Sequence, residues 1–136
     1  MQKKVFIQSN NRQLFGATLA SFAIKKYSPG VEVEIINVDE LPQFKAFANV
    51  SYLFNESEER VYDTKDLQSF TLSRFMPPEL MAFSGRAVVI DPDIFALSDI
   101  NKLLESDMAG ASILACPKKS SWDSSVMLLD CAKLLH

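Results

Sequence analysis

The sequence predicts an α/β fold in which a mostly parallel sheet is flanked by helices. Two observations predict it. A β-α-β pattern occupies the first 35 residues, and a continuous apolar, β-branched run at 87–90 is typical of a strand buried in the middle of a sheet. With 136 residues and no repeat or low-complexity tract, the chain suits a single domain spanning residues 1–136.

The opening β-α-β unit follows from three neighbouring patterns. Residues 4–8 form a short apolar run that breaks at the polar cluster 9–12, as a strand does at a loop. Three apolar residues at helical spacing, Phe15, Leu19 and Phe22, predict a helix. Residues 28–30 can end this helix. Residues 31–35 then alternate apolar and acidic, which predicts a strand with one wet face. A parallel crossover would place residues 8–11 at the carboxyl edge of the sheet, where ligands of α/β folds bind.

The middle of the chain is less regular. From 41 to 63 the pattern is mixed aromatic and acidic, and it predicts an exposed connection with one helical turn at most. Asp63 or Thr64 can begin a helix that carries Leu67, Phe70 and Arg74 and is interrupted by Pro77 and Pro78.

The last third of the sequence predicts further strands of the sheet. The central strand 87–90 ends abruptly at Asp91-Pro92-Asp93, and Asp99 can cap a short helix over residues 100–104. Residues 110–115 predict another buried strand and 126–129 one more. Residues 132–135 begin a helical pattern, so we expect the sheet to be incomplete at the C-terminus.

Composition excludes several classes of protein. With 14 Lys+Arg against 17 Asp+Glu the net charge is −3, and no basic stripe offers a footprint for nucleic acid. The apolar stretches are shorter than a membrane span, and no signal-type region precedes the first strand, so we expect a cytoplasmic protein. Cys116 and Cys131 lack metal or redox spacing and are expected to be reduced core residues.

Two carboxylates at a strand end are the candidate metal ligands. Asp91 and Asp93 can present oxygens to one hard divalent cation, which in turn can share a nucleotide diphosphate. A bare Asp-x-Asp is equally a turn or a helix-capping pair, and that alternative stays open.

The order of these segments resembles the GT-A glycosyltransferases, most closely the family 8 type that transfers sugars from UDP-sugars with retention. The resemblance rests on residues 5–11, Ser73-Arg74-Phe75, Pro78-Glu79-Leu80, 88–95, Asp99-Ile100, 110–112 and 124–130. It implies a nucleotide-diphospho-sugar transferase-like fold in three layers, α/β/α, with Mn²⁺ (or Mg²⁺) on Asp91 and Asp93. It also implies a nucleotide-sugar site, to which we assign Gln8, Ser9, Asn10, Asn11, Arg74, Asp91 and Asp123.

Each assignment outside the acidic pair has a structural alternative. Asn10 and Asn11 could cap the following helix, Arg74 could be a solvated surface residue, and Asp123 could be a turn residue. Trp122 could stack on a sugar ring or anchor a hydrophobic lid.

Two departures limit the resemblance. The sequence Asp123-Ser124-Ser125 stands where the family usually has Asn-x-Gly, and the only histidine is His136, whereas the family completes its metal shell with a later histidine. We therefore expect the donor-binding portion of a glycosyltransferase, inactive as this chain alone, with an unknown sugar or glycan as acceptor. The alternatives are a catalytically inactive binding module and, less favoured, a haloacid-dehalogenase-type phosphatase. An incomplete sheet also predicts a homo-oligomer formed through an exposed sheet edge or apolar face.

Overall fold

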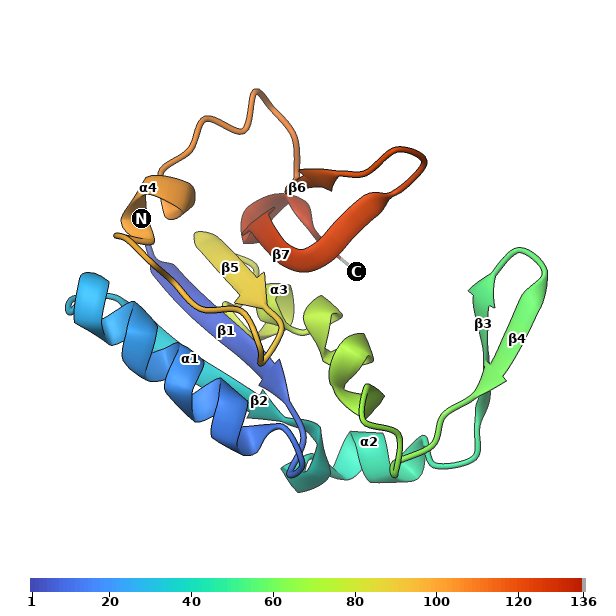
Figure 1. The fold of residues 1–136 in the computed structure, drawn as a ribbon. Coiled ribbons are helices and arrows are strands. Elements are labelled where there is room, and N and C mark those ends of the chain that lie inside the picture. The colour runs from blue at the N-terminus through green and yellow to red at the C-terminus, as the bar shows by residue number, and fades with distance from the viewer. Residues whose placement is uncertain (136) are drawn as a thin grey trace.

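A computed structural model describes residues 1–135, except for the side chain of Phe54. Within these residues, a five-stranded sheet in the order β2-β1-β5-β7-β6 forms the centre (Figure 1). Its strands are β1 (Lys3–Ser9), β2 (Glu32–Asn37), β5 (Arg86–Ile90), β6 (Ile113–Pro117) and β7 (Trp122–Asp130). Strand β1 runs parallel to β2 and β5, whereas β7 runs antiparallel to β5 and β6. The predicted α/β fold with a mostly parallel sheet is confirmed.

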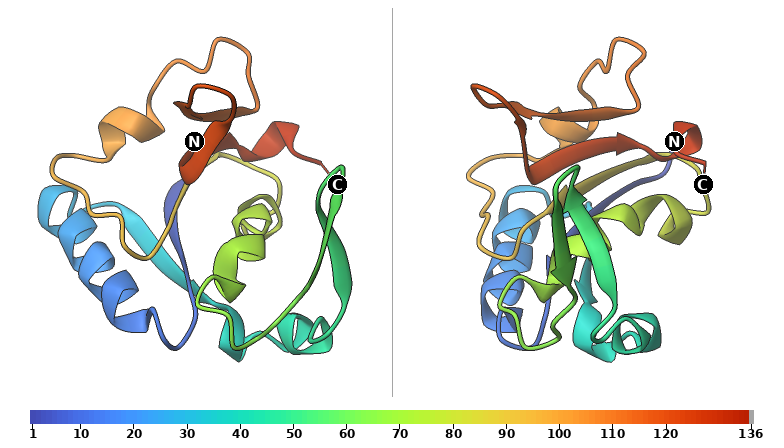
Figure 2. Two further views of the ribbon diagram at one scale, coloured as in Figure 1. Left: turned by 45° about the vertical axis from the view of Figure 1, so that its right-hand side comes forward. Right: turned by 90° about the vertical axis from the view of Figure 1, so that its right-hand side faces the viewer.

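Helices cover both faces of this sheet (Figure 2). The helices are α1 (Leu14–Tyr27), α2 (Pro42–Ala46), α3 (Pro77–Leu80) and α4 (Asn101–Leu104), with 3-10 turns η1 (Val38–Glu40), η2 (Ser69–Phe75) and η3 (Cys131–Lys133). Side chains of α1 and α4 share one core cluster with the sheet, and residues next to α3 and in η3 share the cluster on its opposite face. The expected three layers are therefore present.

The central position of β1 and β5 in the core explains why their sequences are continuous apolar runs. Val5 and Val88 point to the α1 face and Phe6 and Val89 to the other face, and all four side chains have no exposed area. Burial on both faces favours apolar residues at every position of a strand.

Helix α1 lies where the sequence predicts it, but it faces the other way. Its buried side consists of Ala17, Ala20 and Ile24, whereas the large apolar residues used to predict it are exposed. Small side chains let the helix lie close to the sheet. The approach at Gly16 is tighter still, because a Cβ there would lie 2.9 Å from the carbonyl oxygen of Pro92.

The connection from 41 to 63 contains more structure than the predicted single turn. Besides α2 it forms an antiparallel hairpin of β3 (Ser51–Asn55) and β4 (Glu58–Val61), which stands away from the sheet in Figure 1. The hairpin turn is held locally, since Asn55 Oδ1 accepts the Ser57 N–H at 3.0 Å. All of β4 is exposed, so this strand has no buried face that apolar alternation could reveal.

The predicted helix from Asp63 or Thr64 is shorter than expected and begins later, as the 3-10 turn η2. Asp63 and Asp66 each accept the backbone N–H two residues ahead, from Lys65 and Gln68, both at 2.8 Å. Such local hydrogen bonds compete with helix formation, which explains the delay.

Three further expectations for the C-terminal part are corrected. The strand predicted at 110–115 is β6, which pairs only with β7 and lies at the sheet edge, with Ile113 44% exposed. Instead of a helix starting at 132, only η3 is present in the described residues. Cys131 is buried, and burial raises its pKa to about 11, but Cys116 is exposed on β6 and not in the core. Strand β7 confirms the prediction at 126–129 and extends it on both sides.

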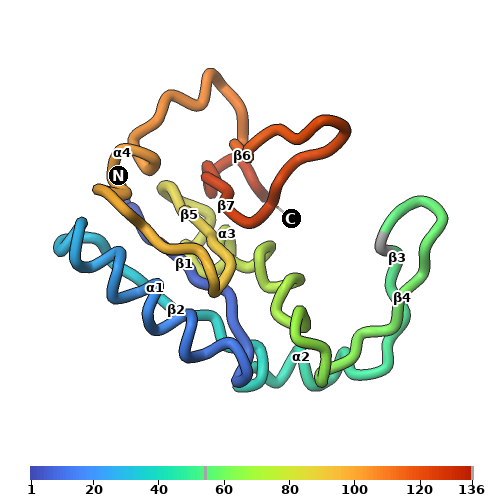
Figure 3. The backbone as a smooth tube through the Cα atoms, viewed as in Figure 1, coloured from blue at the N-terminus to red at the C-terminus, as the bar shows by residue number. Residues whose placement is uncertain are grey.

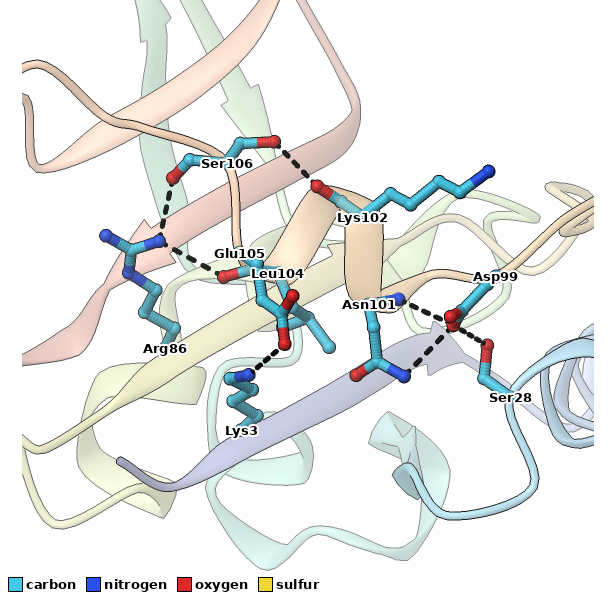
Figure 4. Close-up of polar contacts among 9 residues, drawn as sticks. All are labelled: Lys3, Ser28, Arg86, Asp99, Asn101, Lys102, Leu104, Glu105 and Ser106. Atoms are coloured by element: carbon cyan, nitrogen blue, oxygen red, sulfur yellow. Dashed lines mark hydrogen bonds and ion pairs between the residues drawn. The ribbon is translucent and has the colours of Figure 1, made fainter.

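Polar contacts fix the segment between β5 and α4 (Figure 4). Ser28, at the end of α1, donates its hydroxyl to Asp99 Oδ1 at 2.6 Å. On β5, Arg86 Nη1 donates to the carbonyl oxygens of Leu104 and Ser106 at 3.2 and 2.7 Å. The loop after β5 is thus held at the end of α1, and the C-terminal end of α4 is held against β5. None of the helices in the described range is long and apolar enough to cross a membrane.

Candidate functional site

The carboxyl ends of the parallel strands and the start of β7 meet at one edge of the sheet. Gln8 lies at the end of β1, Asp91 directly follows β5, and Ser124 and Ser125 lie at the start of β7. The Asp91 N–H donates to the Ser125 carbonyl oxygen at 3.0 Å. The predicted position of a ligand site therefore gathers side chains from three strands.

Asp91 is held by Gln8 of β1 and by Arg74 of η2. Gln8 Nε2 donates to Asp91 Oδ1 at 2.5 Å, and Arg74 Nη2 lies 3.7 Å from the same oxygen. The Asp91 side chain is 20% exposed. Burial raises its pKa, while the Arg74 charge and the Gln8 hydrogen bond act in the opposite direction. Gln8 itself is fully buried, and its Oε1 has no hydrogen-bond partner within residues 1–135.

Arg74 links the acidic strand end to a cavity. Its Nε donates to the Thr71 carbonyl oxygen at 2.8 Å, and its Nη1 donates to Ser124 Oγ. The cavity, of about 480 Å³, lies between the β3–β4 hairpin, η2 and β7, and its lining includes Tyr52, Phe75 and Arg74. The guanidinium thus stands between Asp91 and a volume large enough for a small polar ligand.

The two predicted metal ligands differ in how far their side chains are exposed to solvent. Asp93 is exposed, whereas Asp91 is mostly buried and already contacts Gln8 and Arg74. No group of three or more His, Cys, Asp or Glu side chains that could hold a metal occurs in the described part of the chain. Two carboxylates fit a Mg²⁺- or Mn²⁺-type site only if water and ligand phosphates supply the remaining oxygens. His136 lies outside the described residues.

Ser9 and Asn10, both predicted to bind the nucleotide-sugar, are buried and hydrogen-bonded within the protein. Ser9 Oγ donates to the Asn10 carbonyl oxygen at 3.0 Å. Asn10 Oδ1 accepts the Gln13 N–H at 3.0 Å, and its Nδ2 donates to Ser69 Oγ at 2.9 Å and to the Leu67 carbonyl oxygen at 3.0 Å. Asn10 therefore joins the β1 loop to η2 and supports the start of α1.

Asn11 is exposed, and it lies beside an acid that the sequence analysis did not consider. Its N–H donates to Asp39 Oδ2 at 2.8 Å, and its Oδ1 accepts from Asn37 Nδ2 at 2.9 Å. Asp39 also lines a second cavity, of about 290 Å³, with Phe44 and Tyr62. Its position just after a strand parallel to β1 is a signal that could have identified it.

Within the described residues, Asp123 and Trp122 form no hydrogen bond or ion pair with Asp91, Gln8 or Arg74, and Asp123 is connected to Asp91 only through Ser125. Asp123 Oδ1 accepts the Ser125 N–H at 2.9 Å, and Oδ2 lies 3.1 Å from Lys118 Nζ. These contacts, led by those with Ser125, lower the pKa of Asp123 to about 2. Trp122 is 70% exposed. The residue that reaches Arg74 is the neighbouring Ser124, which the sequence analysis did not single out.

Comparison with known proteins identifies the fold. No protein-family model matches the chain, and no curated protein sequence matches it. Among solved structures, the glycosyltransferase GlyE of Streptococcus pneumoniae matches with a TM-score of 0.68 and 14% identity, over 97% of this chain and 35% of GlyE. An active-site mutant of LgtC matches with a TM-score of 0.64 and 13% identity, over 97% of this chain and 58% of LgtC.

A second LgtC structure, a galactosyltransferase in complex with donor and acceptor sugar analogs, matches with a TM-score of 0.60 and 14% identity. This match covers 59% of the LgtC chain and 97% of the present chain. The chain thus spans between about a third and three fifths of the length of these proteins. Over that span, the chain has the fold of the GT-A-type glycosyltransferases.

Proposed function

We propose that the chain forms the donor-binding part of a glycosyltransferase that takes a UDP-sugar and transfers it with retention to a sugar or glycan acceptor. A divalent cation, Mn²⁺ or Mg²⁺, would serve as cofactor on Asp91 and Asp93. The fold supports the reaction class, and the cluster at the carboxyl edge of the sheet supports the donor site.

The observation that carries this proposal is the contact of Asp91 with Arg74. An arginine 3.7 Å from a strand-end carboxylate places a fixed positive charge beside a group suited to a hard cation. A nucleotide diphosphate matches this pair, because its oxygens can accept hydrogen bonds from the guanidinium and complete a metal shell. The cavity beside Arg74 gives such a ligand room.

Each residue has a separate task in this proposal. Gln8 orients Asp91 through its 2.5 Å hydrogen bond, and Asp91 and Asp93 supply carboxylate oxygens. Ser124 and Thr71 fix the Arg74 side chain so that its charge is positioned before the donor binds. A bound divalent cation would offset the negative charge that develops on the diphosphate leaving group.

Calorimetric titration of UDP with and without Mn²⁺ tests the proposal. Two carboxylates alone should bind Mn²⁺ weakly, and UDP adds oxygens to the shell, so each ligand should tighten the other. We expect Asp93→Asn to abolish this coupling without harm to folding, because Asp93 is exposed. We expect Asp91→Asn to abolish it as well.

Asp130→Asn is the matched control for Asp91→Asn. Asp130 ends β7 at the opposite edge of the sheet, and its side chain is 21% exposed, against 20% for Asp91. This variant should keep the coupling between UDP and Mn²⁺. If the unmodified protein binds UDP equally with and without Mn²⁺, or does not bind it, the donor-site proposal is wrong and a catalytically inactive module takes its place.

A further inference from the structure

Helix α1 turns its large apolar side chains to the solvent. Phe15, Leu19 and Phe22, here called the α1 ridge, follow one another at helical spacing on the outer side of the helix and are 78%, 44% and 69% exposed. The inner side of α1 is apolar too and packs on the sheet. A helix that is hydrophobic all round is normally covered all round. We therefore expect a binding partner to cover the α1 ridge.

The segment 92–99 adds apolar surface next to α1. It is anchored at both ends of the helix by the contacts at Gly16 and Ser28, and it runs alongside α1 in Figure 3. Within it, Phe95 and Leu97 are 45% and 84% exposed. The exposed apolar surface in this region thus comes from two elements.

The charges on α1 are all positive. From Arg12 to Val31 the sequence holds Arg12, Lys25 and Lys26 and no Asp or Glu, although the chain carries 17 acids and a net charge of −3. Lys25 and Lys26 are exposed at the C-terminal end of α1. The neighbouring segment holds two acids. Asp93 is exposed and lies toward the opposite end of the helix, next to Gly16, whereas Asp99 is half-buried at the lysine end and accepts a hydrogen bond from Ser28. The charges on the helix itself favour an anionic partner.

The three side chains of the α1 ridge are by themselves too few to fill one side of a stable protein interface. Its three side chains expose roughly 400 Å² in total, given the roughly 200 Å² that a phenylalanine can bury. Each side of a stable protein interface buries about 800 Å². A lipid surface sets no such requirement, because a few aromatic and aliphatic side chains can enter it while lysines contact the headgroups.

We propose that the α1 ridge docks on an anionic lipid surface. The helix lies in the plane of the membrane, with Phe15, Leu19 and Phe22 at the boundary of headgroups and acyl chains. Lys25 and Lys26 contact lipid phosphates. No membrane-spanning helix is involved, and the inference does not depend on the proposed glycosyltransferase activity.

Vesicle co-sedimentation of the full chain tests this docking. We expect binding to vesicles of equal parts phosphatidylcholine and phosphatidylglycerol, weaker binding at high salt, and little binding to phosphatidylcholine alone. The double variant Phe15→Ser/Phe22→Ser should bind at least about tenfold more weakly. Lys25→Gln/Lys26→Gln should weaken binding to the anionic vesicles and remove its salt dependence.

Phe75→Ser is the matched control, because Phe75 is an exposed aromatic outside α1, at 62%. It should bind vesicles as the unmodified chain does, and thermal unfolding should show that all these variants are folded. Absence of sedimentation, equal sedimentation with neutral vesicles, or an equal loss in Phe75→Ser would contradict the proposal. So would a dimer in solution that Phe15→Ser/Phe22→Ser dissociates, because the ridge would then be covered by a second copy.

Discussion

Asn10 is the residue whose role the sequence leaves most open, and the structure assigns it a supporting position. It is 2% exposed and hydrogen-bonds to Gln13, Leu67 and Ser69. Asn10→Ala removes the side-chain partners of buried polar groups, so we expect it to lower the free energy of unfolding by about 2 kcal/mol. Denaturant unfolding measures this, with Asn11→Ala as the control at an exposed neighbour. An equal, small effect of both substitutions would contradict the structural role.

The pKa of Asp123 gives a second prediction, for acid pH. Hydrogen bonds from Ser125, and then the contact with Lys118, lower this pKa from 3.8 to about 2 in the folded state. A lowered folded-state pKa means that the carboxylate stabilises the fold above about pH 4 and loses this contribution as the pH falls to about 2. Asp123→Asn should therefore reduce thermal stability at pH 6 more than at pH 2. An NMR titration of Asp123 with a midpoint near its ordinary value would refute this.

The sequence predicts which strand ends meet better than it predicts side-chain contacts. Gln8 and Asp91 lie together because the ends of parallel strands share one edge of a sheet, and Arg74 reaches Asp91 from η2. Asp39 was not identified, although it follows a strand parallel to β1 and so carries the same signal as Gln8. Ser124 was not identified because the pattern of strands does not show that its hydroxyl contacts Arg74, which depends on tertiary packing.

Helix α1 and the loop after β5 are coupled at Gly16. Gly16→Ala would gain helix propensity, about 1 kcal/mol, but its Cβ would lie 2.9 Å from the Pro92 carbonyl oxygen between Asp91 and Asp93. The loop must then shift, and we expect UDP affinity to fall while the fold persists. Gly30→Ala is the control, because a Cβ there has no heavy atom within 4 Å. Unchanged UDP binding in Gly16→Ala, measured by calorimetry, would show that the loop position does not matter.

Strands could be predicted from the sequence where the sheet buries one or both of their faces, and not where both faces are exposed. Strands β1, β2 and β5 lie where the apolar patterns put them. The β3–β4 hairpin was missed because exposed strands need no apolar face. The existence of α1 was predictable, but its orientation was not, since the sheet accepts alanines at the closest approach and leaves larger residues outside.

Strand β6 forms an apolar edge of the five-stranded sheet, and a homo-oligomer formed through this edge remains our prediction. Strand β6 holds no charged residue and borders an apolar cavity of about 230 Å³ lined by Leu103, Leu114 and Val126. Such an edge can pair with a second copy. We expect a dimer by light scattering at high concentration, and a monomer for Ile113→Lys, which places a charge at an exposed edge position. A strictly monomeric unmodified protein would contradict the prediction.

The carboxyl edge of the sheet, around Asp91, is the proposed binding site for the diphosphate of a nucleotide-sugar. The most direct measurement is the change in backbone amide NMR shifts when UDP and Mg²⁺ are added together, since Mg²⁺ is diamagnetic. We predict that the shifts change at Gln8, Arg74, Asp91 and Ser124 and not at Asp130, at the opposite edge. Changes confined to other parts of the chain, or no changes at saturating UDP, would contradict the account.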